Sequence, residues 1–305
     1  MKLSTEIGST ARVVGEEKAV ELVAKAGFTA WDFSMIRFWK YSWSTGAVLP
    51  CDHPLCGTNY LAFARELRHI GKECGITCNQ SHAPFDTKYG QPFNPSCDTF
   101  RNVTRAIEVA SILGAEQIVV HSIAMPKELT EDTEATHAYA MEYYRALLPF
   151  AEEFGIRIAV ENLFVRHKEK FVYSGRLNRP DTLSRVVREL DSPWATACLD
   201  MGHAAMVGYE PEDFVRGMDK GALGAVHFQD GDYIEDRHTL PYLGQYHWAE
   251  IMKALAETGY RGDLTFEIYK YYQNLPDEAI PHALKMAEAV GRSLIRIFQS
   301  GGTES

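Results

Sequence analysis

The sequence lacks long hydrophobic runs, a basic charge excess and a dense set of cysteines, and each absence argues against a class of protein. No apolar run reaches the roughly 18 residues that a membrane-spanning helix needs. Acidic residues outnumber basic ones by 41 to 31, giving a formal net charge of −10. We therefore do not expect nucleic acid as a partner, because nucleic-acid binders usually carry a basic surface. Residues 1–6 have the pattern of a strand rather than a signal peptide, so we expect a cytoplasmic protein with no membrane association.

The six cysteines are too few for a disulfide framework in a chain of 305 residues. Cys74, Cys78 and Cys198 fall in or beside expected core elements, where cysteine acts as a small buried hydrophobe. The segment Cys51–Cys56 contains His53 between its cysteines and could hold a metal ion. It offers only three candidate ligands with no fourth nearby, so we favour an ordinary loop.

What the sequence does contain is a regular alternation of short apolar runs with amphipathic helical patterns. The expected strands lie at 3–6, 30–33, 77–82, 117–121, 157–161, within 194–200, at 225–229 and at 263–267. The expected helices lie at 16–26, 61–74, 100–113, 134–154, 180–190, 211–218, 248–258 and 281–298. Such alternation predicts a parallel sheet, and eight units predict a single (β/α)₈ TIM barrel. We expect one α/β catalytic domain over residues 1–299 and a disordered tail over 300–305. An open, doubly wound sheet is the alternative, but no glycine-rich dinucleotide fingerprint follows the first strand.

Polar side chains gather where the expected strands end, which is where barrel enzymes place their active sites. These residues are His82, His121, Glu161, Asp200, His203, His227, Asp230, Asp236, His238 and Glu267. Each alone has a structural explanation, such as a hydrogen-bonded histidine or a salt-bridged glutamate. Together, however, several carboxylates meeting at one end of a barrel would be costly to bury unless a cation neutralised them. The pattern therefore predicts a metal site.

Four of these residues come from the last four expected strands: Glu161, Asp200, His227 and Glu267. Three carboxylates and one imidazole form an oxygen-rich site that suits Mn²⁺, Mg²⁺ or Co²⁺ better than Zn²⁺. Cys198 lies two residues before Asp200 and should point the same way but deeper into the barrel, so it offers no thiolate to the site. We expect one divalent ion, with Mn²⁺ as the first choice.

At these motifs the chain resembles the xylose-isomerase-like TIM-barrel superfamily, which includes sugar isomerases, ketose 3-epimerases, inosose dehydratases and zinc-dependent abasic-site endonucleases. The similar motifs are Val160–Asn162, Leu199–His203, His227–Asp230, Asp236–His238 and Thr265–Glu267. They occur in order and cover nearly the whole chain. They are specific for the superfamily but only weakly specific for the reaction.

The resemblance implies a metal-dependent isomerase or epimerase of a sugar, sugar phosphate or cyclitol. Glu161 and Glu267 would then be both metal ligands and the catalytic proton-transferring pair. A metal ion bound to a carbonyl and its adjacent hydroxyl stabilises the enediolate that forms when a carbon-bound proton leaves. His203 and Arg237 would donate hydrogen bonds to substrate oxygens.

Three other functions use the same site. In a lyase, removal of the same proton would be followed by loss of a β-substituent. In the abasic-site endonucleases, a three-zinc cluster has ligand types that match His82, His121, Glu161, Asp200, His203, His227, Asp236, His238 and Glu267. Sugar-active relatives share much of this set, so we interpret His82 and His121 as substrate-binding and Asp236 and His238 as possible additional metal ligands. The acidic chain favours the sugar enzyme over the endonuclease. A non-catalytic sugar-binding barrel is the third alternative.

Two loops bear on the substrate. The aromatic segment Met35–Trp43 is too long for a simple barrel turn. Its Trp39 could pack against the apolar face of a bound sugar. Alternatively, the segment could form a hydrophobic cluster under the loop or at a subunit contact. We expect a homo-oligomer. The charged run Arg166–Lys170 could bind a phosphate, although a solvated loop is the more usual role of such a run. The choice between a free sugar and a sugar phosphate stays open.

Overall fold

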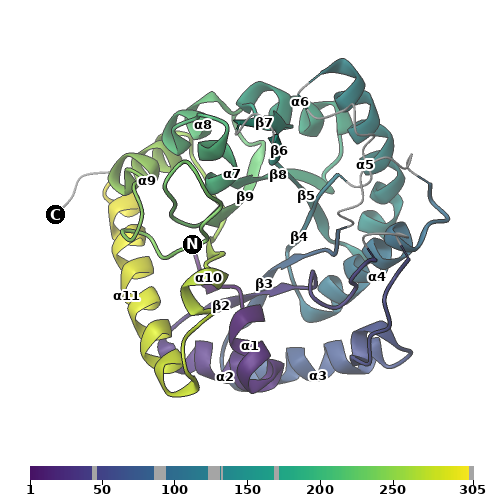
Figure 1. The fold of residues 1–305 in the computed structure, drawn as a ribbon, viewed down its shortest axis with the longest axis vertical. Helices are drawn as coiled ribbons and strands as arrows, with labels where there is room; N and C mark the ends of the chain where they lie inside the picture. The colour runs from purple at the N-terminus through teal and green to yellow at the C-terminus, as the bar shows by residue number, and fades with distance from the viewer. Residues whose placement is uncertain (43–46, 86–93, 123–130, 132, 168–171, 302–305) are drawn as a thin grey trace.

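The computed structural model describes residues 1–42, 47–85, 94–122, 131, 133–167 and 172–301. Figure 1 shows a ring of helices around a central sheet. Eight parallel strands form that sheet in the order β1-β10-β9-β8-β5-β4-β3-β2. They are β1 (Leu3–Thr5), β2 (Ala30–Ser34), β3 (Thr77–His82), β4 (Gln117–Val120), β5 (Arg157–Glu161), β8 (Ala195–Asp200), β9 (Leu223–Phe228) and β10 (Leu264–Phe266).

The sheet closes on itself between its first and last members. A parallel bridge joins Glu6 to Asp32, and the amide of Ile7 donates to the Asp32 carbonyl at 3.2 Å. On the same seam the Thr29 amide donates to the carbonyl of Leu3 at 3.0 Å. The predicted (β/α)₈ barrel is therefore confirmed.

The helices surround the barrel and differ little from those expected. They are α1 (Gly8–Val14), α2 (Glu16–Ala26), η1 (Pro54–Cys56), α3 (Tyr60–Glu73), α4 (Asp98–Leu113), α5 (Glu134–Phe154), α6 (Pro180–Leu190), α7 (Met201–Met206), α8 (Pro211–Gly217), α9 (Trp248–Glu257), α10 (Tyr269–Tyr272), η2 (Asp277–Ala279) and α11 (Ile280–Gln299). Helices α4 and α5 end at Gly114 and Gly155, with φ of 90° and 64°. Glycine adopts this left-handed conformation without steric cost, which is why it marks these helix ends in the sequence.

Four features were absent from the sequence-based expectation: α1, α7, α10 and an antiparallel hairpin of β6 (Leu163–His167) with β7 (Val172–Arg176). Each element has only four to seven residues. Such lengths are too short to display a helical or alternating pattern. All four follow the carboxyl ends of barrel strands, so the missed elements concentrate at the mouth of the barrel.

The strands alternate between two hydrophobic layers. Ile118 and Val120 of β4 pack into the large core between sheet and helices, whereas the intervening Val119 joins a separate small cluster. The other members of that cluster are Ala159, Cys198 and Ala225, one from each of the next three strands. Cys198 is buried as expected, but its sulfur lies within 4.8 Å of possible ligand atoms of Glu161 and His227, so the expectation that it has no place in the site is not borne out.

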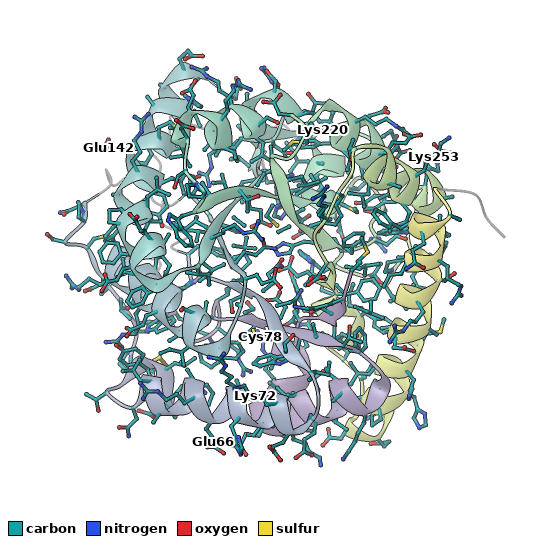
Figure 2. All side chains as sticks on the ribbon, turned by 180° about the vertical axis from the view of Figure 1, so that it is seen from behind. Glu66, Lys72, Cys78, Glu142, Lys220 and Lys253 are labelled. Carbon is teal, nitrogen blue, oxygen red and sulfur yellow. A yellow bond between two sulfur atoms is a disulfide. The ribbon has the colours of Figure 1, made fainter. Side chains whose placement is uncertain are left out.

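The cysteines otherwise behave as small hydrophobes, with two refinements. Cys78 is buried as expected, and Figure 2 shows it inside the ring of helices while Glu66, Glu142 and Lys253 lie on the periphery. Cys74 is only half-buried, because it caps the end of α3. Cys51 and Cys56 are joined by a disulfide, so neither thiol is available to a metal ion.

Among the helices of the described residues, none combines the length and apolarity needed to cross a bilayer. Of the predicted tail, Ser300 and Gly301 follow α11 directly, and residues 302–305 lie outside the described residues.

Candidate metal centre

The carboxyl ends of four adjacent strands bring together the four predicted ligands. Glu161 ends β5, Asp200 ends β8, His227 lies in β9 and Glu267 directly follows β10. The Nδ1 atom of His227 lies 2.9 Å from Glu161 Oε1, 3.2 Å from Glu267 Oε2 and 3.7 Å from Asp200 Oδ2. All four side chains are at least nine-tenths buried, and each offers a donor atom within 4.8 Å of the others. Parallel pairing causes this convergence, because Asp200 pairs with His227 and His227 with Thr265.

Two further histidines approach Glu161 from the neighbouring strands. His121 Nε2 lies 2.5 Å from Glu161 Oε2, and His82 Nε2 lies 3.4 Å from the same oxygen. The two imidazoles meet edge to face, with ring centroids 4.9 Å apart. Phe85 stacks on the other side of His121 at 4.2 Å. These three residues form a second group of possible metal ligands that shares Glu161 with the first.

A third group lies on the opposite flank and shares Asp200. It contains His203 of α7 and His238 from the loop after β9. His238 Nε2 lies 2.9 Å from Asp236 Oδ2. The backbone amide of His203 donates to Asp200 Oδ1 at 2.8 Å, so the ligand carboxylate also caps α7. Nine of the ten acidic and histidine residues predicted at the strand ends, all except Asp230, thus form one continuous cluster.

Backbone carbonyls fix the orientation of three of these histidines. His82, His203 and His238 each donate from Nδ1, which leaves Nε2 directed at the cluster. The accepting carbonyls belong to Ala83, Asn162 and Glu267, at 2.8, 2.8 and 2.9 Å. Metal-binding histidines commonly donate their second N–H in this way. His227 has the opposite orientation: its Nδ1 faces the carboxylates.

Two buried amides hold Asp200 in place. Asn162 Oδ1 accepts from the Asp200 amide at 2.7 Å, and Gln229 Nε2 donates to both Asp200 carboxylate oxygens at 2.8 and 2.9 Å. Gln229 Oε1 in turn accepts from the His238 amide at 2.8 Å. Gly202 permits this arrangement, since an added Cβ would lie 2.6 Å from Gln229 Nε2. Sequence analysis gave these amides no role, although both sit within the motifs that carry the ligands.

Burial and the imidazoles divide the three carboxylates into two kinds. Burial disfavours the charge of Glu161, but His121 and His227 outweigh it and hold the pKa of Glu161 well below its usual value. Asp200 is also buried, and His203 and His227 likewise lower its pKa. For Glu267, burial dominates and raises the pKa to about 7. One site therefore contains two ionised carboxylates and one that exchanges a proton near neutrality, an arrangement suited to acid–base catalysis.

The donor set fits a divalent cation. Burying several carboxylates together is unfavourable unless positive charge compensates them. The neighbouring histidines supply part of that charge: Asp236, for example, overcomes the effect of burial and raises the pKa of His238 to about 10. Oxygen and imidazole donors at this spacing are those that Mn²⁺, Mg²⁺, Co²⁺ and Zn²⁺ accept. The buried cluster is consistent with a divalent metal site.

Two predicted substrate-binding residues lie away from the cluster. Trp39 is 2% exposed and packs in the hydrophobic core with Phe38, which favours the packing alternative for the aromatic segment. Arg237 is half exposed, and its Nε pairs with Asp232 Oδ2 at 2.6 Å. Asp230 is also structural, because it accepts hydrogen bonds from the backbone of its own loop and from the Trp248 indole. Trp43 and residues 168–170 lie outside the described residues.

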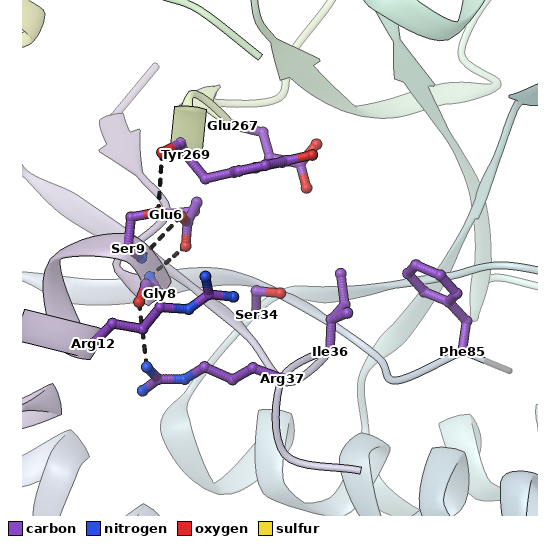
Figure 3. Close-up of a pocket in the computed structure, with 10 residues that line it drawn as sticks. All are labelled: Glu6, Gly8, Ser9, Arg12, Ser34, Ile36, Arg37, Phe85, Glu267 and Tyr269. Carbon is purple, nitrogen blue, oxygen red and sulfur yellow. Dashed lines mark hydrogen bonds between the residues drawn. The ribbon is translucent and has the colours of Figure 1, made fainter. Parts of the chain in front are cut away.

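A cavity of about 270 Å³ opens beside Glu267 (Figure 3). It is lined by Glu6, Gly8, Ser9, Arg12, Ser34, Ile36, Arg37, Phe85, Glu267 and Tyr269. The Tyr269 ring lies 4.3 Å from that of His238, so the cavity is continuous with the metal-ligand cluster. Apart from Glu267, and from Ile36 and Arg37 within the aromatic segment Met35–Trp43, sequence analysis identified none of these residues as part of a site. The only signal was their position directly after strands β1, β2, β3 and β10.

Comparison with known proteins places this geometry in a family. A family model described as "Xylose isomerase-like TIM barrel" matches residues 20–290. An uncharacterized protein of Sinorhizobium fredii is 24% identical over 285 residues, covering 83% of this chain and 81% of that protein. An uncharacterized protein of Methanocaldococcus jannaschii is 25% identical over 224 residues, covering 68% of this chain and 74% of that protein.

Solved structures share the whole fold at low identity. A D-tagatose 3-epimerase-like protein superposes with a TM-score of 0.70 and 21% identity, covering 99% of this chain and 100% of that one. A D-psicose 3-epimerase crystallised with D-fructose gives 0.67 and 17%, covering 97% and 99%. The IOLI protein, solved with a bound zinc atom, gives 0.69 and 16%, covering 98% and 99%. At these identities the likeness shows a common fold.

Proposed function

The chain belongs to the xylose isomerase-like TIM-barrel family, and on that premise we propose that it is a divalent-metal-dependent isomerase or epimerase of a sugar, sugar phosphate or cyclitol. One observation carries the proposal. Glu161, Asp200, His227 and Glu267 present donor atoms within 4.8 Å of one another at the mouth of the barrel. The ketose 3-epimerases among the structural neighbours support the same class of reaction.

The residues of the site supply acid–base chemistry around the ion. A divalent ion held by the four ligands would polarise a substrate carbonyl and its adjacent hydroxyl. Glu161, held ionised by its two imidazoles, accepts the carbon-bound proton. Glu267 delivers a proton to the same carbon or its neighbour. Exchange of both carboxyls with water restores the starting state, so solvent hydrogen enters the product.

Histidine side chains around the four proposed metal ligands provide polar groups that can contact the substrate. His82 and His121 direct Nε2 at Glu161, and His203 belongs to the group that shares Asp200, so each could hydrogen-bond a substrate hydroxyl. His82 and His203 are the better oriented pair, because a backbone carbonyl fixes each ring.

The direct test is solvent-hydrogen incorporation. The protein is loaded with Mn²⁺ and incubated in deuterated buffer with a panel of ketoses and cyclitols, and products are analysed by mass spectrometry and NMR. We expect one deuterium at a single carbon and no other change in mass. Glu267→Gln should abolish incorporation, and exposed Glu66→Gln on α3 serves as the control. Loss of water from the substrate would indicate the lyase, and binding without exchange would indicate a non-catalytic barrel.

A second function, a three-zinc phosphodiesterase acting on abasic sites, is favoured by one observation. The possible ligands fall into four overlapping groups, each of which contains Glu161 or Asp200, rather than one isolated group. The net charge of −10 counts against a DNA substrate. Metal analysis of the purified protein separates the two functions: about three zinc ions per chain with cleavage of an abasic-site duplex would replace our proposal, whereas a single ion would support it.

A further inference from the structure

The cavity beside Glu267 has a charged wall and an apolar wall. Figure 3 shows Arg12 and Arg37 on one side and Ile36 and Phe85 on the other. Its volume of about 270 Å³ approaches that of small ligand pockets, which begin at about 300 Å³. Because Glu267 lines it, a substrate placed over the metal ligands can extend into it without leaving the barrel mouth.

The two arginines that line the cavity, Arg12 and Arg37, differ in their ion pairing. Arg37 is neutralised, since it pairs with Glu16 and also donates to the Gly8 carbonyl at 3.2 Å. Glu6 is buried, and its carboxylate accepts from the backbone amides of Gly8 and Ser9. Arg12, in contrast, is exposed and makes no ion pair with any residue that the structure describes. Burial also raises the pKa of Glu6 above its usual value.

The segment that presents Arg12 is held in place from two sides. Ser9 Oγ donates to the Tyr269 carbonyl at 3.0 Å, which ties α1 to α10. Arg37 ties the start of α1 to the segment after β2. Helix α1 thus presents Arg12 at the cavity from a backbone that is held on two sides.

We propose that this cavity receives a carboxylate or phosphate group at the end of the substrate remote from the reacting carbon, with Arg12 as its counter-ion. The inference rests on the proposed function and narrows it to anionic sugars, either sugar acids or sugar phosphates. Arginine suits both groups, because its planar guanidinium can donate two parallel hydrogen bonds to either. Ile36 and Phe85 then cover the apolar face of the carbon chain.

The test compares matched probes on the Mn²⁺-loaded full-length chain by isothermal titration calorimetry. The probes are D-fructose, D-fructose 6-phosphate and D-fructuronate, which share a carbon skeleton and differ in the terminal group. We expect at least one anionic probe to bind at least about tenfold more tightly than D-fructose, because a hydrogen bond to a charged group contributes a gain in affinity of this size. The anion preferred identifies phosphate or carboxylate. In Arg12→Gln the ratio of the two dissociation constants should fall to near one.

Controls make the result specific to this cavity. Arg65→Gln removes an exposed arginine on α3 that does not line the cavity, and it should keep the wild-type ratio. Circular dichroism of R12Q establishes that its fold is intact. A wild type without preference for either anion overturns the proposal, and so does a preference that survives in R12Q. Deuterium exchange measured on the same samples is a separate readout: anion preference without exchange would remove the proposed reaction but leave the anion site standing.

Discussion

The two sides of the barrel mouth are built differently. On the β5–β10 side, the ligand carboxylates and imidazoles are buried, and most of their donors and acceptors are already engaged by neighbours such as Asn162 and Gln229. On the β1–β2 side, the cavity is open, and the exposed Arg12 makes no ion pair within the described part of the chain. A prearranged side suits a metal ion and chemistry, whereas an open side suits recognition of the remainder of a substrate. This difference predicts that substitutions on the two sides will affect different measurements.

On the β5–β10 side of the mouth, which we call the metal side, Gln229→Met should weaken metal binding more than any other substitution outside the ligands themselves. The substitution keeps the length of the side chain but removes the amide that donates to both Asp200 oxygens and accepts from the His238 backbone. Loss of such a supporting contact typically weakens metal binding by about 10- to 100-fold. Titration of Mn²⁺ into the apo protein measures it.

Gln117→Met is the matched control for this prediction. Gln117 is also a buried glutamine at a strand, but its amide donates to Gln80 and to the Gly224 carbonyl rather than to a ligand. It should lower stability without weakening metal binding. Equal losses of Mn²⁺ affinity in the two variants would contradict a specific role for Gln229.

The metal side was also the more predictable from sequence. The carboxyl ends of parallel strands meet at one end of the barrel, so polar residues there come together: Asp200 pairs with His227, and Glu161 pairs with Cys198, two residues before Asp200. Long helices such as α5 have enough turns to reveal their periodicity and a glycine to mark the end. Neither inference needs knowledge of how loops pack.

The β1–β2 side of the mouth, which we call the cavity side, could not be predicted in this way. Its residues come together only through tertiary structure, which no local sequence pattern encodes. Closure of the barrel places the segment after β1 beside Glu267 and Tyr269, about 260 residues later in the chain. Helix α1 is seven residues long and shows no clear periodicity. Trp39 illustrates the same limit. The aromatic residues of its segment suggested a surface that contacts the substrate, but the Trp39 side chain is buried in the core, and only the tertiary packing determines this.

A second prediction concerns the pH dependence of Mn²⁺ binding by the ligand cluster. Burial raises the pKa of Glu267 to about 7, so below that pH the carboxyl is protonated and a metal ion must displace the proton. In a plot of the logarithm of Mn²⁺ affinity against pH, the slope should therefore be one unit larger below about pH 7 than above it. Each further drop of one pH unit then costs an additional tenfold in affinity. Glu267→Gln should remove that extra slope. A profile with the same slope on both sides of pH 7 in the wild type would contradict this assignment.

The smallest effect belongs to the cavity side and concerns stability rather than metal. Burial opposes ionisation of Glu16, but the His53 and Arg37 contacts prevail and lower its pKa. A carboxyl with a lowered pKa stabilises the fold above its unfolded pKa of about 4.5, and this contribution is lost as pH falls through the folded value. Glu16→Gln should cost about 1 kcal/mol at pH 7 and much less at pH 3, as measured by urea denaturation. Its Mn²⁺ affinity should match that of the wild type, because Arg37 and Glu16 support the cavity and not the ligands; a clear loss of affinity would mean that the two sides are coupled.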